Sequence, residues 1–130
     1  MANEISIRKE DVVSLTQNHD LGEIIKPLQR EIHLFDSFVA GTTHLQDSAV
    51  LDEIKVGDKL TLRREKNKFD DNAIMILTES GKKLGYVPEK DNIVFARLLD
   101  AGKLLIARIA KIEEKGSFKQ ISIGIYLIDF

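Results

Sequence analysis

The sequence has 130 residues, the length of one domain with a short appendage, and its 43% hydrophobic content allows a packed core. The absence of cysteine excludes disulfides and thiolate metal sites, and a formal charge of −2 argues against a protein that coats duplex DNA by neutralising many phosphates. No apolar run approaches the roughly 20 residues of a membrane helix, and the N-terminus lacks a signal-peptide core, so we expect a cytoplasmic protein without a membrane partner.

The first 34 residues form a pattern typical of helices. Apolar residues recur at helical spacing in two short stretches, residues 11–15 and 21–28. Asp20 suits an N-cap, with Glu23 three residues later as its capping-box partner, whereas Pro27 would kink a helix interior. We therefore expect residues 1–34 to be an N-terminal helical extension, either one broken helix or two.

From Ile32 onward the pattern changes to strands, so we assign residues 35–130 to the main domain. Residues 33–44 are rich in apolar and β-branched side chains, and residues 59–65 alternate. Residues 73–87 predict a hairpin around the turn at 79–81, and residues 104–114 and 118–130 predict two further strands joined across Gly116.

One internal helix is expected after the central hairpin. Pro88 suits its start, residues 93–99 form its apolar stripe, and Gly102 suits its C-terminal cap. About six antiparallel strands with one helix indicate a mainly β, α+β domain: a small barrel or a strongly curved sheet.

The segment from Val56 to Lys103 resembles the HIRAN domain family. Its family pattern begins with G-(E/D)-x-L-x-L-x-R-E, seen here from Gly57 to Glu65, and continues with N-x-(Y/F)-D-x-N-A-I, from Asn67 to Ile74. G-(Y/H)-(V/I)-P follows the hairpin at 85–88, and L-L-D-x-G closes the helix at 98–102. The ordered set of blocks is specific, although no single block is.

This resemblance implies an OB-like barrel that recognises the 3′ ends of single-stranded DNA. In such a site bases stack on aromatic rings without sequence preference. A carboxylate accepts a hydrogen bond from the free 3′-hydroxyl and repels a phosphate in its place, while nearby donors hold the inner phosphates. DNA repair is the expected process, a helicase or nuclease is the expected class of protein partner, and no cofactor is expected.

The resemblance assigns roles to individual residues. Phe69 matches the stacking ring and Asp70 the carboxylate that reads the terminal hydroxyl, while Asn67 matches a polar contact in the same loop. Glu89 stands where the family carries a phosphate-binding lysine. The remaining matches are Thr43 and His44 at a strand end, Tyr86 in place of a phosphate-contacting histidine, Lys90 as the cation next to Glu89, and Phe118 as a further ring.

The residues themselves allow simpler interpretations. Phe69 could equally plug the core where a strand begins. Asp70, Asp71 and Asn72 commonly form turns by bonding their own backbone. The cations from Arg63 to Lys68 could serve as an edge that discourages aggregation; among them Arg64 and Lys66 flank the Phe69 loop and are candidate phosphate contacts.

Two rival functions follow from the sequence. In an enzyme, Asp70 and Asp71 with Glu65 or Glu89 would hold a divalent cation. However, adjacent acids on an extended chain point apart, the three histidines lack ligand spacing, and no phosphate-binding G-x-x-x-x-G-K-(S/T) motif is present, so we expect no catalysis. In a protein-interaction or oligomerisation module, the N-terminal helices would mediate contacts and the barrel would be only a scaffold. The oligomeric state is left open.

Overall fold

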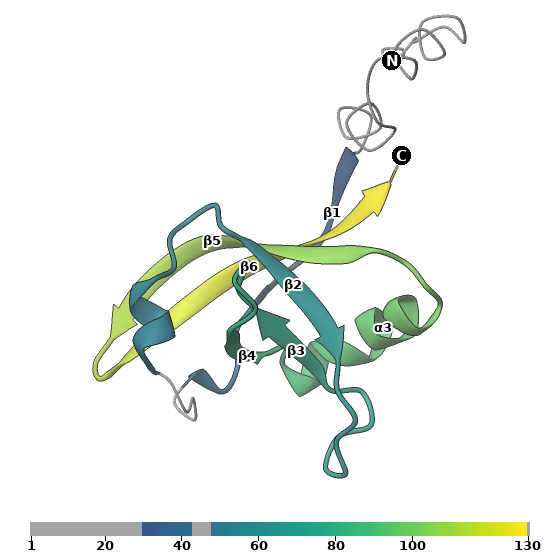
Figure 1. The fold of residues 1–130 in the computed structure, drawn as a ribbon, viewed down its shortest axis with the longest axis horizontal. Coiled ribbons are helices and arrows are strands. Elements are labelled where there is room, and N and C mark those ends of the chain that lie inside the picture. Colours follow the sequence, from purple (N-terminus) through teal and green to yellow (C-terminus); the bar gives the residue numbers. More distant parts are fainter. Residues whose placement is uncertain (1–29, 43–47, 130) are drawn as a thin grey trace, which may run out of the picture.

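The computed structural model describes residues 30–42 and 48–129, which form an antiparallel sheet and one α-helix (Figure 1). The elements are β1 (Arg30–Phe38), the 3-10 helix η3 (Ser48–Asp52), β2 (Lys59–Arg64), β3 (Ile74–Leu77), β4 (Lys83–Tyr86), α3 (Glu89–Asp100), β5 (Leu105–Lys115) and β6 (Phe118–Asp129). In this part of the chain no helix has the length and apolar character needed to cross a membrane. The mainly β prediction and the single helix after the central hairpin are confirmed.

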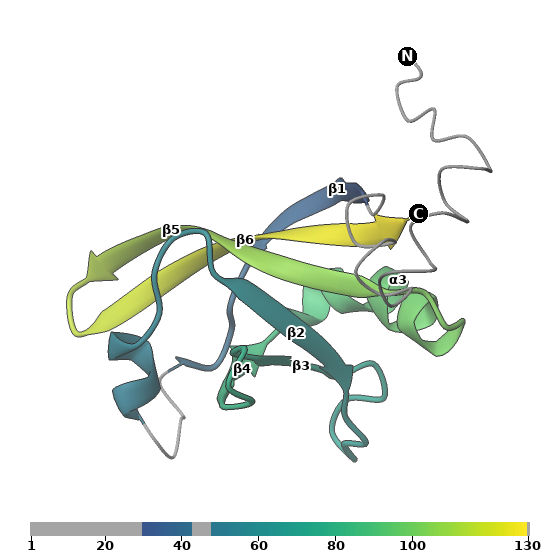
Figure 2. The same ribbon diagram turned by 45° about the horizontal axis from the view of Figure 1, so that its top comes forward.

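The six strands form one sheet in the order β1-β6-β5-β2-β3-β4. Figure 2 shows β1, β6 and β5 above β2, β3 and β4, so the sheet is strongly curved. The edges meet at one point after β1. There the amide of Ala40 donates to the carbonyl of Tyr86 at 2.8 Å, and the amide of Tyr86 donates to the carbonyl of Ala40 at 2.9 Å. The predicted OB-like barrel is therefore not confirmed, because the described strands form an open sheet that is joined at a single bridge.

A glycine makes this bridge possible. A Cβ atom on Gly85 would lie 2.4 Å from the carbonyl oxygen of Ala40, a distance that real side chains do not adopt. The chain therefore needs glycine at this position because the backbone of the segment after β1 approaches β4 so closely.

The core lies on the concave side of the sheet, where alternate strand residues are buried. Leu60 and Leu62 of β2 lie below one-tenth exposure, and helix α3 contributes Phe95 and Ala96. The remaining fully buried aliphatic side chains are Val50, Ile74, Ile76, Leu84, Ala107, Ile109, Ile121, Ile123 and Ile125. Burial of the alternate residues agrees with the period-two patterns on which the strand predictions rested.

The helical prediction for the N-terminal extension is wrong for residues 30–34, which belong to β1. Arg30 lies opposite Asp129 in the register, with an ion pair of 2.9 Å, and Ile32 lies opposite Leu127. Pairing with β6 supplies the backbone partners that a local helix would otherwise provide. The rest of the predicted extension, residues 1–29, lies outside the described residues.

An ion pair across the sheet predicts a small pH dependence of stability. The guanidinium of Arg108 donates to the carboxylate of Glu31 at 2.7 Å, which lowers the pKa of Glu31. Stability from this pair is present above the unfolded-state pKa, about 4.3, and is lost as the pH falls through the lower folded-state value.

We expect Glu31→Gln to lower the free energy of unfolding by less than about 1 kcal/mol at pH 7, because the pair is partly exposed. Urea melts of both proteins between pH 7 and pH 3 would test this. A difference that does not shrink towards pH 3 would contradict the assignment.

Candidate nucleic-acid interface

The loop between β2 and β3, residues 65–73, is built from two side-chain turns. Asn67 Oδ1 accepts a hydrogen bond from the amide of Phe69 at 2.8 Å, and Asp70 Oδ1 accepts one from the amide of Asn72 at 2.9 Å. The turn-forming interpretation of Asp70 is therefore confirmed. These local bonds explain why the loop has short polar side chains at Asn67 and Asp70.

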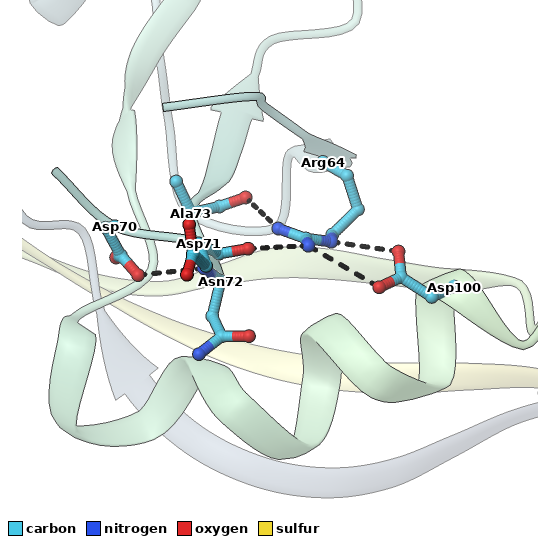
Figure 3. A network of polar contacts seen from close by, with 6 residues as sticks. All are labelled: Arg64, Asp70, Asp71, Asn72, Ala73 and Asp100. Carbon is cyan, nitrogen blue, oxygen red and sulfur yellow. Dashed lines mark hydrogen bonds and ion pairs between the residues drawn. The ribbon is translucent and has the colours of Figure 1, made fainter. Parts of the chain in front are cut away.

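Arg64, at the end of β2, fastens this loop to helix α3. Its Nη1 donates to the carbonyl of Ala73 at 2.8 Å and its Nη2 to the carbonyl of Asp71 at 2.8 Å, while Nε donates to Asp100 Oδ1 at 2.9 Å (Figure 3). The planar guanidinium suits three such partners at once. The sequence suggested Arg64 as a phosphate contact, yet in the structure its donors are engaged within the protein.

Phe69 stands at the tip of the loop with 83% of its surface exposed. The interpretation of Phe69 as a core plug is therefore wrong. The ammonium of Lys68 lies 5.2 Å from the centre of the ring, a cation–π contact at the surface. A large ring held in water has no role in packing, so the ring is available to a ligand.

An open hollow of about 250 Å³ lies beside the ring. Its described lining comes from the loop, from the bridge between the sheet edges and from the start of α3. The lining residues are Ala40, Gly41, Asn67, Phe69, Asp70, Ala73, Tyr86, Val87 and Glu89. The structure thus brings together four predicted site residues, Asn67, Phe69, Asp70 and Tyr86, from separate parts of the chain.

The Asp70 carboxylate is fixed from two sides. Oδ1 completes the turn with Asn72, and Oδ2 accepts a hydrogen bond of 2.9 Å from Nδ2 of Asn92 in α3. Asn92 is only 1% exposed. Sequence reasoning missed Asn92, although a buried amide within an amphipathic helix is a signal that a polar partner must lie beside it.

Tyr86 belongs to a second polar network. Its hydroxyl donates to the Glu65 carboxylate at 2.8 Å and accepts from Lys83 at 2.7 Å. The Nδ2 of Asn67 also donates to Glu65, at 3.3 Å. Sequence reasoning suggested that this hydroxyl would donate to a phosphate, whereas here it donates to a carboxylate.

The other predicted site residues lie elsewhere. Lys66 is exposed in the loop, but Lys90 is paired with Asp91 at 3.0 Å and does not line the hollow. Phe118 lines a separate hollow of about 210 Å³ at the turn between β5 and β6. Thr43 and His44 lie outside the described residues.

The described part of the chain shows no cluster of side chains for the divalent cation that the rival, metal-dependent enzyme would need. Within residues 30–42 and 48–129, no group of three or more histidine or acidic side chains is placed to hold a metal ion. Asp70, one of the acids of that rival cation site, instead receives two internal hydrogen-bond donors. The arrangement offers a surface ring, an oriented carboxylate and flexible lysines, which suits binding.

Comparison with known proteins shows the family and the fold. The HIRAN domain model matches residues 32–127, and no curated protein matches the chain. A protein of known structure from Lactobacillus plantarum is 27% identical, with a TM-score of 0.73, over 78% of this chain and 99% of its own. The HIRAN domain of human HLTF is 14% identical, with a TM-score of 0.61, over 77% of this chain and 78% of its own, a likeness of fold.

Proposed function

We propose that this chain, which belongs to the HIRAN domain family, binds single-stranded DNA and recognises its free 3′ end at the β2–β3 loop. The family is known for DNA binding, and its domains are generally binding modules and not catalytic ones. The proposal extends this family property to a specific ligand and to specific residues.

The observation that carries the proposal is the exposed Phe69 ring next to a fixed carboxylate. A base that stacks on such a ring gains about 1–3 kcal/mol whatever its identity. Phe69, at 83% exposure, offers the ring without rearrangement of the core. The hollow beside it leaves room for the sugar of the stacked nucleotide.

Asp70 supplies the selectivity for an end. Each of its carboxylate oxygens accepts one internal hydrogen bond and keeps a further lone pair for a ligand. A terminal 3′-hydroxyl can donate to that lone pair. A 3′-phosphate, or the phosphate of a continuing strand, would place like charges together and is disfavoured.

The inner phosphates lie outside the hollow in this proposal. Lys66 and Lys68 flank the ring on the exposed loop and can reach phosphates of the preceding nucleotides. Thr43 and His44, which lie outside the described residues, stay in the proposed site on sequence grounds. Lys90 and Phe118 would meet only nucleotides further from the end, since neither lines the hollow.

Fluorescence anisotropy at low salt tests the proposal with two labelled strands of one sequence, ending in a 3′-hydroxyl or a 3′-phosphate. We expect the hydroxyl end to bind about tenfold more tightly or better, the effect of one hydrogen bond to a charged group. Equal affinity for both ends would contradict end recognition and leave attraction between charges as the only source of binding. Binding of neither would overturn the proposal.

One observation favours the alternative, a protein-interaction or oligomerisation module. The edge strand β1 leaves Ile32, Leu34 and Phe35 between 38% and 39% exposed. That alternative would be supported if the protein bound neither DNA strand and eluted as a concentration-dependent oligomer in size-exclusion chromatography.

A further inference from the structure

We infer that the hollow is suited to a 3′-terminal ribonucleotide, with Asp70 accepting its 3′-hydroxyl and Glu89 its 2′-hydroxyl. The inference rests on the proposed function, because it concerns the same site and names the sugar that the site prefers. It makes Glu89 a residue that determines specificity between ribose and deoxyribose.

The described polar side chains around the hollow offer mainly acceptors to a ligand. Asn67 uses its oxygen within the loop and one N–H of its amide on Glu65. Tyr86 uses its hydroxyl proton on the same carboxylate. What remains is the outward lone pairs of Asp70 and the whole carboxylate of Glu89, which is exposed and has no hydrogen-bond or ion-pair partner among the described residues. This lining therefore favours a ligand that brings donors.

No cation belongs to the described lining of the hollow. Three nearby cations are turned to other partners: Arg64 to the loop carbonyls and Asp100, Lys83 to Tyr86, and Lys90 to Asp91. The exposed Lys66 and Lys68 lie on the loop and do not belong to the described lining. A phosphate inside the hollow would face two carboxylates with no cationic side chain among the described lining residues. The group that enters is therefore uncharged, as a terminal sugar is.

Glu89 and Asp70 both line the hollow. Asn92, which contacts Asp70 at 2.9 Å, is three residues after Glu89 in α3, so the two helical residues share a face one turn apart. When a nucleotide stacks on Phe69 with its 3′-hydroxyl at Asp70, the adjacent 2′ carbon of its sugar then faces Glu89 in this proposal.

Ribose presents two hydroxyl donors on adjacent carbons, whereas deoxyribose presents one. With deoxyribose the Glu89 carboxylate gains no partner and loses water around it. With ribose each carboxylate accepts one hydroxyl, which matches the two acceptors with two donors. A carboxylate that accepts from a ribose 2′-hydroxyl is a proven means of sugar recognition in nucleotide-binding proteins.

The experiment uses the full chain and three DNA strands that differ only in the last nucleotide, which carries a 2′-deoxy, 2′-hydroxyl or 2′-O-methyl group. We expect the 2′-hydroxyl strand to bind about tenfold more tightly than the deoxy strand. The 2′-O-methyl group, which cannot donate, should remove this gain. Glu89→Gln should reduce the ratio towards one, while Glu79→Gln, on an exposed turn outside this hollow, should leave it unchanged.

Equal affinity for the deoxy and ribo ends in the unaltered protein, or a ratio that survives Glu89→Gln, would overturn the inference. A Glu89-dependent preference among deoxy ends of different base would also overturn it, because the carboxylate would then read the base edge. Discrimination of the 3′-hydroxyl from the 3′-phosphate in the same assays would leave the proposed function standing in each case. Failure to bind any strand would overturn both.

Discussion

Asp70→Asn should abolish the preference for a 3′-hydroxyl over a 3′-phosphate, reducing a ratio of about ten or more to about one. The amide keeps the size of the carboxylate but carries no charge, so a terminal phosphate is no longer repelled. Its one oxygen can satisfy only one of the two internal donors, from Asn72 and Asn92, so the side chain also loses its fixed orientation. Anisotropy titrations with both ends would measure the ratio.

Asp71→Asn is the matched control for this experiment. Asp71 is adjacent and exposed, and its contact with Arg64 uses the backbone carbonyl, which the substitution preserves. Its ratio should equal that of the unaltered protein. If Asp71→Asn lost the preference, or if Asp70→Asn retained it in a protein with an unchanged melting temperature, the end-reading role of Asp70 would be refuted.

Arg64→Ala should weaken binding to every strand by more than about tenfold although Arg64 touches no ligand in our proposal. Removing the guanidinium leaves the carbonyl of Asp71 without its donor and the carbonyl of Ala73 with only the amide of Glu65. It also removes the ion pair to Asp100, so that, among the described residues, the bond between Asp70 and Asn92 alone ties the loop to α3. Hydrogen bonds to a charged group are worth about 1.5–3 kcal/mol each in favourable settings. The ring and carboxylate would then no longer be held in one geometry, a loss of pre-organisation.

The salt dependence of binding distinguishes this role from direct phosphate contact. If Arg64 contacted a phosphate, its removal would lower the slope of log K against log salt by about 1. We expect that decrease for Lys66→Ala, an exposed cation on the same loop, and an unchanged slope for Arg64→Ala. A decreased slope for Arg64→Ala would instead indicate that Arg64 contacts a phosphate directly.

Asp100→Asn isolates one part of the Arg64 arrangement. It removes the charge partner at 2.9 Å but leaves the two bonds to the loop carbonyls. Because the Asp100 side chain is 58% exposed, the effect on affinity should be less than about threefold. A loss as large as that of Arg64→Ala would show that the ion pair, and not the carbonyl contacts, holds the loop.

The sequence alone predicted the elements whose pattern is local. Leu60 and Leu62 alternate because β2 has one buried face, and Pro88 and Gly102 mark the limits of α3 within one or two residues. The family resemblance also singled out Phe69 and Asp70 before any geometry was known. Alternation, caps and turn formers act over a few residues, so they can be read along the chain.

Only the tertiary structure decided which contacts those residues make. Residues 30–34 form a strand because β6 lies beside them, Arg64 turns inward because α3 places Asp100 within reach, and Asn92 meets Asp70 across 22 positions of sequence. The same holds for the exposure of Phe69, which periodicity left undecided. Hydrogen bonds and burial depend on partners that are distant along the chain, and a side chain of a given type does not specify which partner the fold will bring to it.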